Sequence, residues 1–163
     1  MCHGHQVQMD SATCWERLRA ARHGVLGTVH ASRGVDAVPV VFVTEGVRDE
    51  IGVRDEIGVR DEIGVRDEIV IPIDAVKPKR GSRLQRLRNL DGDDRTVLIV
   101  EHYDDDWSQL WWVRVHGKAR EAEPTSGDLD RLANAFPAYA APGSVTSVIV
   151  LTPTDVTGWS AGV

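Results

Sequence analysis

The sequence predicts a mainly β protein, a small β-barrel with a few helices packed on its outside. Many short apolar segments alternate with turn residues, and only three segments have helical spacing. The 163 residues, 42% of them hydrophobic, are enough for one domain with a buried core. We therefore expect a single domain at residues 10–160, preceded by a flexible tail at residues 1–9.

The helix and strands of the first part follow from local patterns. A helix is expected at residues 13–22, because Thr13 and Glu16 fit a capping box. Strands are expected at residues 24–30 and 36–44, with a turn between them. Pro39 removes a backbone donor from the second strand, which fits a sheet edge, a bulge or a position covered by a ligand.

Residues 46–69 are four identical copies of Gly-Val-Arg-Asp-Glu-Ile. A period of six scatters the apolar residues around a helix, and as a strand it places an aspartate on the apolar face. Four short copies are also too few for a stacked repeat protein. We interpret the segment as a duplication that lengthens a β-hairpin, since loop length costs stability only logarithmically.

The second part continues with strands and two short helices. Ser82 and Gln85 fit another capping box, and Pro153 is expected to end the last strand. The expected strands are residues 69–73, 96–103, 110–116, 118–122 and 145–152, and the expected helices are residues 84–90 and 128–135.

Composition limits the class of protein. The net charge of −6 argues against general nucleic-acid binding, and the longest apolar runs are too short to cross a membrane. The N-terminal residues lack the apolar stretch of a secretion signal, and Cys2 and Cys14 are interpreted as reduced thiols. These features predict a cytoplasmic protein.

A basic segment is the strongest candidate for a binding site. Residues 77–88 contain six basic residues and no acidic one, at the junction of a strand and a helix. Lys77, Lys79 and Arg80 precede the expected helix N-terminus, where free N–H groups favour an anion such as phosphate. Arg83, Arg86 and Arg88 are interpreted as a solvated helix face.

Two other clusters receive structural interpretations. His102, Asp104 and Asp106 alternate as metal ligands could, but a strand end with an acidic turn explains them more simply, and no metal site is predicted. Trp107, Trp111 and Trp112 are expected to pack in the core or an interface, although one of them could stack on a planar cofactor.

Several segments resemble the pyridoxamine 5′-phosphate oxidase-like split β-barrel family. They are ARHGVLGTV (21–29), AVPVVF (37–42), IPIDAVKPKR (71–80) and RLQRLRNL (83–90). Residues 102–107 and 110–114, with Gly117, resemble the actinobacterial deazaflavin (coenzyme F-420)-dependent oxidoreductases of that family. The similarity covers most of residues 10–160.

This resemblance implies an FMN-binding-like split β-barrel that forms a homodimer, with two cofactor sites at the subunit interface. Strand backbone would line the ring system and the basic segment would hold the phosphate. The residues expected to bind the cofactor are Pro39, Val40, Val41, Pro72, Ile73, Asp74, Lys77, Lys79, Arg80 and Trp112. No catalytic side chain is predicted, because the cofactor ring supplies the chemistry.

The expected function is hydride transfer between coenzyme F-420 and a small electron-poor molecule. An FMN-dependent oxidoreductase of the same fold is the close alternative. A non-catalytic protein that carries a flavin or haem is the third possibility. All three involve a small-molecule ligand and neither nucleic acid nor membrane.

Overall fold

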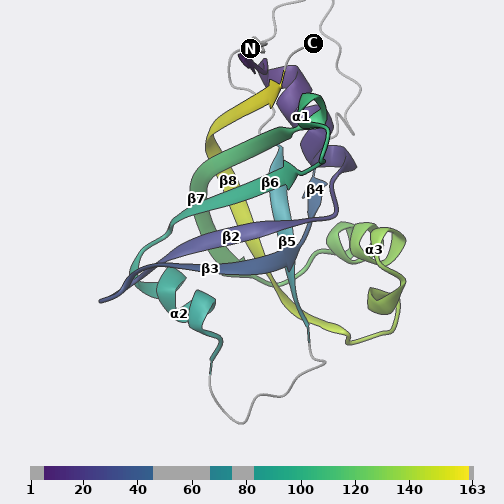
Figure 1. Ribbon diagram of the computed structural model, residues 1–163. Coiled ribbons are helices and arrows are strands. Elements are labelled where there is room, and N and C mark those ends of the chain that lie inside the picture. The colour runs from purple at the N-terminus through teal and green to yellow at the C-terminus, as the bar shows by residue number, and fades with distance from the viewer. Residues whose placement is uncertain (1–5, 46–66, 75–82, 162–163) are drawn as a thin grey trace, which may run out of the picture.

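The computed structural model describes residues 6–45, 67–74 and 83–161, and their strands form one antiparallel sheet (Figure 1). The strands are β1 (Gln6–Gln8), β2 (His23–His30), β3 (Gly34–Val41), β4 (Val43–Glu45), β5 (Glu68–Asp74), β6 (Arg95–His102), β7 (Trp111–Ala122) and β8 (Val145–Ala161). The helices are α1 (Ser11–Ala20), α2 (Gln85–Gly92) and α3 (Ser126–Ala135), with the 3-10 turns η1 (Trp107–Gln109) and η2 (Pro137–Tyr139). The predicted mainly β class is confirmed.

The sheet curls into a barrel. Its strand order is β3-β2-β6-β7-β8-β5-β4, with β1 paired to β8. The two end strands of this path, β3 and β4, are consecutive in the chain and separated only by Phe42. The Phe42 N–H donates to the carbonyl of Arg22 at 3.1 Å, and its ring is fully buried. The barrel therefore closes through a chain connection at Phe42, and Pro39 lies on an edge strand, as one interpretation of the sequence had it.

Strand β5 and residues 148–151 of β8 are buried on both faces. Ile69 and Ile71 belong to the main core cluster inside the barrel, whereas Val70 belongs to a second cluster. Val148 and Val150 of β8 share that second cluster with Leu132 of α3. Because side chains of a strand alternate between its faces, α3 must cover the outer face of these two strands. Figure 1 shows α3 beside the barrel.

The other two helices cover the ends of the barrel. Cys14 and Leu18 of α1 and Leu87 and Leu90 of α2 all join the main core cluster. Figure 1 places α1 near the termini and α2 at the opposite end of the molecule. No helix of the described residues has the length and hydropathy that a membrane crossing requires.

Helix α1 begins earlier than the sequence predicted. The carboxylate of Asp10 accepts a hydrogen bond from the Thr13 N–H at 2.7 Å and caps the helix. The expected capping box of Thr13 and Glu16 was wrong, because Asp10 already satisfies the amide at the first turn and moves the helix start to Ser11. A capping box does occur at α3, where Thr125 and Asp128 each bond the other's backbone N–H.

Strand β8 does not stop at Pro153. It continues to Ala161, and Pro153 lies opposite Gly117 of β7. The next pair along the ladder is His116 with Asp155. Thr154, between Pro153 and Asp155, therefore has no partner on β7 and is the extra residue of a β-bulge. A bulge interrupts the hydrogen-bond ladder, so a proline without an N–H is tolerated there. The same bulge lets β7 run unbroken through Gly117, where two separate strands were expected.

Two expectations concern segments at the edge of the described residues. Gln6–Gln8 form β1 against Trp159–Ala161 of β8, and the Met9 N–H donates to the carbonyl of Gly158 at 3.0 Å. These residues of the expected tail are therefore held by backbone pairing. Strands β4 and β5, which flank the repeat, pair as antiparallel neighbours with Glu45 opposite Glu68. Residues 46–66 of the repeat lie outside the described residues.

A buried polar network joins the β2–β3 hairpin to α2. The Asn89 side-chain amide donates to the Thr28 hydroxyl and to the Asp36 carboxylate, both at 2.9 Å. Arg33 donates two further hydrogen bonds to Asp36, at 2.7 and 2.9 Å. Arg33 first, and Asn89 next, hold the pKa of Asp36 at about 2, below its usual 3.8.

This network predicts acid sensitivity. The pKa of Asp36 is lower in the folded chain than in the unfolded one, so its stabilisation is complete above about pH 4 and is lost as the pH falls towards 2. The unfolding free energy of the wild-type chain, measured by urea denaturation, should therefore rise from about pH 2 to about pH 4. We expect this rise to be smaller in Asp36→Asn. Asp93, whose pKa Arg95 also lowers to about 2, keeps part of the rise. Asp105→Asn, at an exposed aspartate, should retain the wild-type slope; equal slopes in all three proteins would contradict the prediction.

Candidate functional site

A cleft of about 340 Å³ opens where β3 and the end of β5 approach α2 and η2. Its lining combines apolar strand residues with a few polar side chains, the usual composition of a small-molecule site. The residues that line it are His23, Pro39, Val40, Val41, Pro72, Asp74, Arg86 and Tyr139. The structure thus brings together five residues that were expected to bind a cofactor: Pro39, Val40, Val41, Pro72 and Asp74.

Arg86 is the most unusual group in this cleft. Its side chain is half-buried, and its Nε has no hydrogen-bond partner among the described residues. Burial lowers the pKa of the guanidinium, and the nearby Asp74 and Tyr139 oppose that shift. A buried donor without a partner is costly, and such groups are often completed by a ligand.

The two neighbouring arginines behave differently. Arg83 donates to both oxygens of Asp91 at 2.9 Å and pairs with Glu121 at 2.7 Å. Arg88 is exposed and bonds the Gln85 side chain at 2.7 Å. The interpretation as a solvated face therefore holds for Arg88 and was wrong for Arg86, which turns into the cleft.

Helix α2 presents an open N-terminus beside Arg86. Its N-cap residue, Leu84, has no side chain that can accept a hydrogen bond, and no side chain of the described residues caps the helix. The first N–H groups of an α-helix have no partner within the helix and carry the positive end of its dipole. Ser82, the expected capping residue, lies outside the described residues. Arg86 and this helix end together form a cationic region suited to a phosphate.

Tyr139 and Asp74 face Arg86 across the cleft. The Tyr139 hydroxyl donates to a carboxylate oxygen of Asp74 at 3.3 Å. Burial, and secondarily the charge of Asp74, raise the pKa of Tyr139, so the phenol is protonated at neutral pH. A protonated phenol in a cleft can donate a hydrogen bond to a ligand as well as to Asp74.

The remaining expected residues lie elsewhere. Ile73 is only 6% exposed and belongs to the barrel core, so it can offer only backbone to the cleft. Trp112 pairs with Trp159 of β8 and packs its ring under the Arg114 guanidinium at 5.2 Å. It is not among the residues that line the cleft. Lys77, Lys79 and Arg80 lie outside the described residues.

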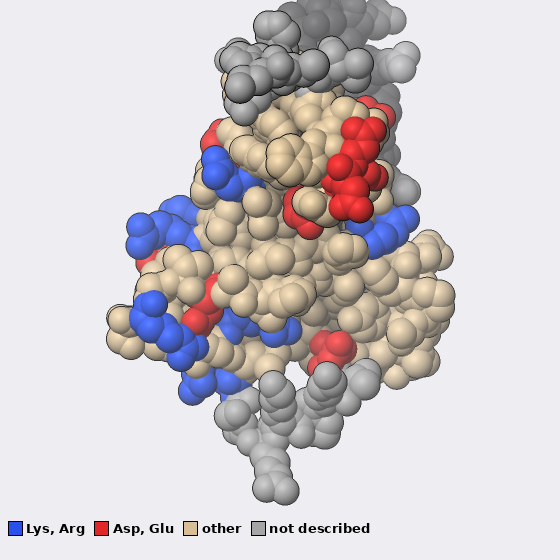
Figure 2. Space-filling view, in the orientation of Figure 1, with Lys and Arg blue, Asp and Glu red and all other residues tan. Residues whose placement is uncertain are grey.

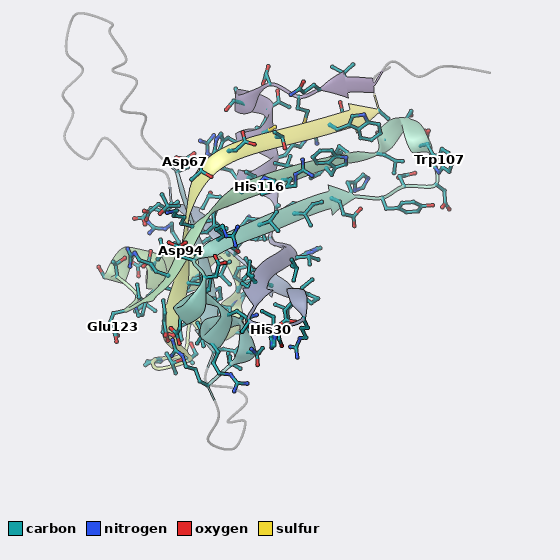
Figure 3. All side chains as sticks on the ribbon, turned by 90° about the vertical axis from the view of Figure 1, so that its left-hand side faces the viewer. His30, Asp67, Asp94, Trp107, His116 and Glu123 are labelled. Carbon is teal, nitrogen blue, oxygen red and sulfur yellow. The ribbon has the colours of Figure 1, made fainter. Side chains whose placement is uncertain are left out.

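No residue of the acidic β6–β7 connection lines the cleft. Figure 3 shows Trp107 at the tip of this connection, far along the sheet from His30. The nearest His102 nitrogen lies 3.9 Å from Asp104, while the Asp106 carboxylate accepts from Ser108 and caps η1. Among the described residues, no three acidic, histidine or cysteine side chains gather as a metal site would need. Trp107 is 71% exposed, whereas Trp111 packs against the core.

Sequence reasoning missed three residues of the cleft: His23, Arg86 and Tyr139. A signal existed for Arg86, because residues three and four positions later, Asn89 and Leu90, are both buried. On a helix such residues share a side, so Arg86 had to border the buried face. His23 and Tyr139 reach the cleft only through the packing of β2 and η2.

Charge is distributed unevenly on the surface. Figure 2 shows Lys and Arg side chains gathered at the lower left, over and around α2, although the whole chain carries a net charge of −6. Acidic side chains lie among them on the left and also where β5 ends. The cleft therefore opens beside the most basic part of this face.

Comparison with known proteins identifies the fold. No family model matches the chain, and no curated protein sequence matches it. A FAD-binding protein from Mesorhizobium loti superposes with a TM-score of 0.62 at 14% identity, covering 97% of this chain and 99% of that one. The FAD binding protein from Mycobacterium smegmatis gives 0.52 at 14% identity, with 94% and 96% covered. A heme binding protein from the same organism gives 0.60 at 18% identity, with 94% of this chain and 55% of that one covered.

At these identities the similarity establishes the architecture and leaves the ligand open. These three neighbours are named as FAD-binding or heme-binding proteins. The chain therefore has the pyridoxamine 5′-phosphate oxidase-like split β-barrel fold.

Proposed function

We propose that this chain binds a phosphorylated flavin-type cofactor in the cleft between β3, β5 and α2. The observation that carries the proposal is the half-buried Arg86 at the first turn of α2: within the described part of the chain, its Nε has no hydrogen-bond partner and the helix start has no side-chain cap. A phosphate would give Arg86 a charge-assisted partner and would also accept from the helix N–H groups. The basic residues Lys77, Lys79 and Arg80 precede the same helix in sequence and would extend this grip.

The apolar strand residues suit the ring system. Val40 and Val41 of β3 and Pro72 of β5 contribute the apolar part of the lining. Tyr139 and Asp74 add a donor and an acceptor within the same cleft. These residues would orient the ring and exclude water, and when bound the cofactor supplies hydride transfer.

The finer proposal is a deazaflavin-dependent oxidoreductase that transfers a hydride between coenzyme F-420 and a small electron-poor molecule. The phosphate and the carboxylates of that cofactor would pair with several of the lysine and arginine side chains near α2. A homodimer that completes each site with partner residues is part of this proposal. FMN binding, and non-catalytic flavin or haem carriage, are the outcomes that would replace it.

A titration with matched ligands tests the proposal. Purified full-length protein is titrated with coenzyme F-420, FMN, riboflavin and haemin, and binding is followed by absorbance and fluorescence. We expect saturable binding of F-420 or FMN and at least tenfold weaker binding of riboflavin, which has the FMN ring without its phosphate. Equal affinity for FMN and riboflavin, or binding of none of the four, would overturn the proposal.

A second measurement separates an enzyme from a carrier. The reduced form of whichever cofactor binds is mixed with the protein and a quinone, and its oxidation is followed by absorbance. Oxidation faster than in the protein-free control supports the oxidoreductase. Binding without any acceleration across several electron acceptors supports a carrier instead.

A further inference from the structure

A second cleft, of about 250 Å³, lies between the end of α1, β4 and α3. Two arginines at the end of α1 and one on α3 line it, and no acidic side chain of the described residues does. The residues that line it are Arg19, Ala21, Arg22, Val43, Thr44, Arg131, Asn134 and Ala135. Two of these arginines are paired with carboxylates outside the lining, Arg19 with Asp67 and Arg131 with Glu45 and Asp128.

Arg131 is held in place by two acidic side chains. Its Nη2 donates to Asp128 at 2.9 Å, and the same nitrogen pairs with Glu45 at 3.0 Å. Asp128 is itself buried and fixed by the capping box at the start of α3. The Nε of Arg131 is buried and has no hydrogen-bond partner among the described residues. The guanidinium is thus held in a fixed position at the edge of the cleft by Asp128 and Glu45.

The Arg22 guanidinium can also donate further hydrogen bonds. Among the described residues, its guanidinium has only two hydrogen-bond contacts, both at 3.4 Å, to the carbonyls of Arg19 and Ala21. No carboxylate of the described residues lies within ion-pair distance of it, whereas Arg19 is paired with Asp67, which Figure 3 labels. Asn134 lies three residues after Arg131 on the same side of α3 and adds an amide to the lining.

We propose that this second cleft binds a small molecule bearing a carboxylate or phosphate group. Guanidinium groups bind such oxyanions through paired hydrogen bonds, and Arg22 and Arg131 supply two of them from different elements. Thr44 and Asn134 provide neutral donors, and the volume suits a ligand smaller than a flavin. The proposal does not depend on a cofactor in the first cleft.

The test uses the full chain at about 0.15 M salt, so that non-specific surface attraction is screened. Succinate and inorganic phosphate are titrated separately, and the arginine Nε–Hε signals are followed by NMR. Saturable shifts of the Arg22 and Arg131 signals are expected with at least one of the two probes. The stronger probe identifies the ligand as a carboxylate or a phosphate.

Variants locate the binding. Arg22→Gln should weaken it about tenfold, since one charge-assisted hydrogen-bond donor is lost. Arg120→Gln, which removes the same charge from an exposed position on β7, should leave it unchanged. Arg86→Gln should also leave it unchanged, because that arginine lies in the first cleft. Absence of saturable binding, or equal weakening by Arg22→Gln and Arg120→Gln, would overturn the proposal.

Discussion

Replacing Arg86 by glutamine is expected to weaken FMN or F-420 binding by about 10-fold to 100-fold. This prediction rests on the proposed function. A hydrogen bond to a charged group contributes about 1.5–3 kcal/mol, and Arg86 would lose both its charge and its forked geometry towards phosphate. Isothermal titration calorimetry of the wild-type and variant chains measures the loss directly.

Two controls show whether the loss comes from the phosphate. Arg88→Gln removes the same charge from the exposed side of α2 and should change the affinity little. Riboflavin, which lacks the phosphate, should bind the wild-type chain and Arg86→Gln equally. If riboflavin and FMN lose affinity in the same proportion, Arg86 acts on the ring or on the fold and the assigned role is wrong.

The Arg86→Gln chain is expected to fold. The Arg86 Nε has no partner among the described residues, so the substitution breaks no hydrogen bond there. It also removes a charge that burial already disfavours. The unfolding midpoint in urea should stay at or above the wild-type value, which keeps an affinity loss interpretable.

The sequence was sufficient for features that depend on local patterns. The alternation of apolar residues located β2 and β5 within one residue of their observed bounds. It also predicted the mainly β class, because strands and turns leave their signal in neighbouring residues. The bulge at Thr154 left no such signal: its position depends on how β8 pairs with β7, and Pro153 alone indicated a strand end.

The candidate site was predictable only in part, for a similar reason. The resemblance located the strand segments around Pro39 and Pro72, which do meet in the first cleft. The orientation of Arg86 was misjudged, because the arginines were interpreted together as one solvated face and the helical spacing of Arg86 to Leu90 was not used. Tyr139 reaches the cleft after α3 packs on the outer face of the barrel, and that packing involves residues distant in sequence.

Replacing Gly117 by alanine is expected to destabilise the fold by about 2–3 kcal/mol or more. Gly117 does not have a positive φ, so the effect is steric. A Cβ at this position would overlap the backbone carbonyl oxygen of Thr152 and would lie 3.0 Å from a Leu151 methyl group. The obstructing atom belongs to the backbone of β8, so relief requires the two strands to separate at the bulge.

Gly92→Ala is the matched control for this substitution. A Cβ there meets no atom within 4 Å, and alanine favours a helix over glycine by up to about 1 kcal/mol. Urea denaturation should therefore show Gly92→Ala at or slightly above the wild-type unfolding free energy and Gly117→Ala far below it. If Gly117→Ala stays within about 0.5 kcal/mol of the wild type, β7 and β8 do not approach as closely at the bulge as described. The close approach matters beyond local packing, because β8 is the strand that joins β7 to β5 and so positions the end of β5 at the first cleft.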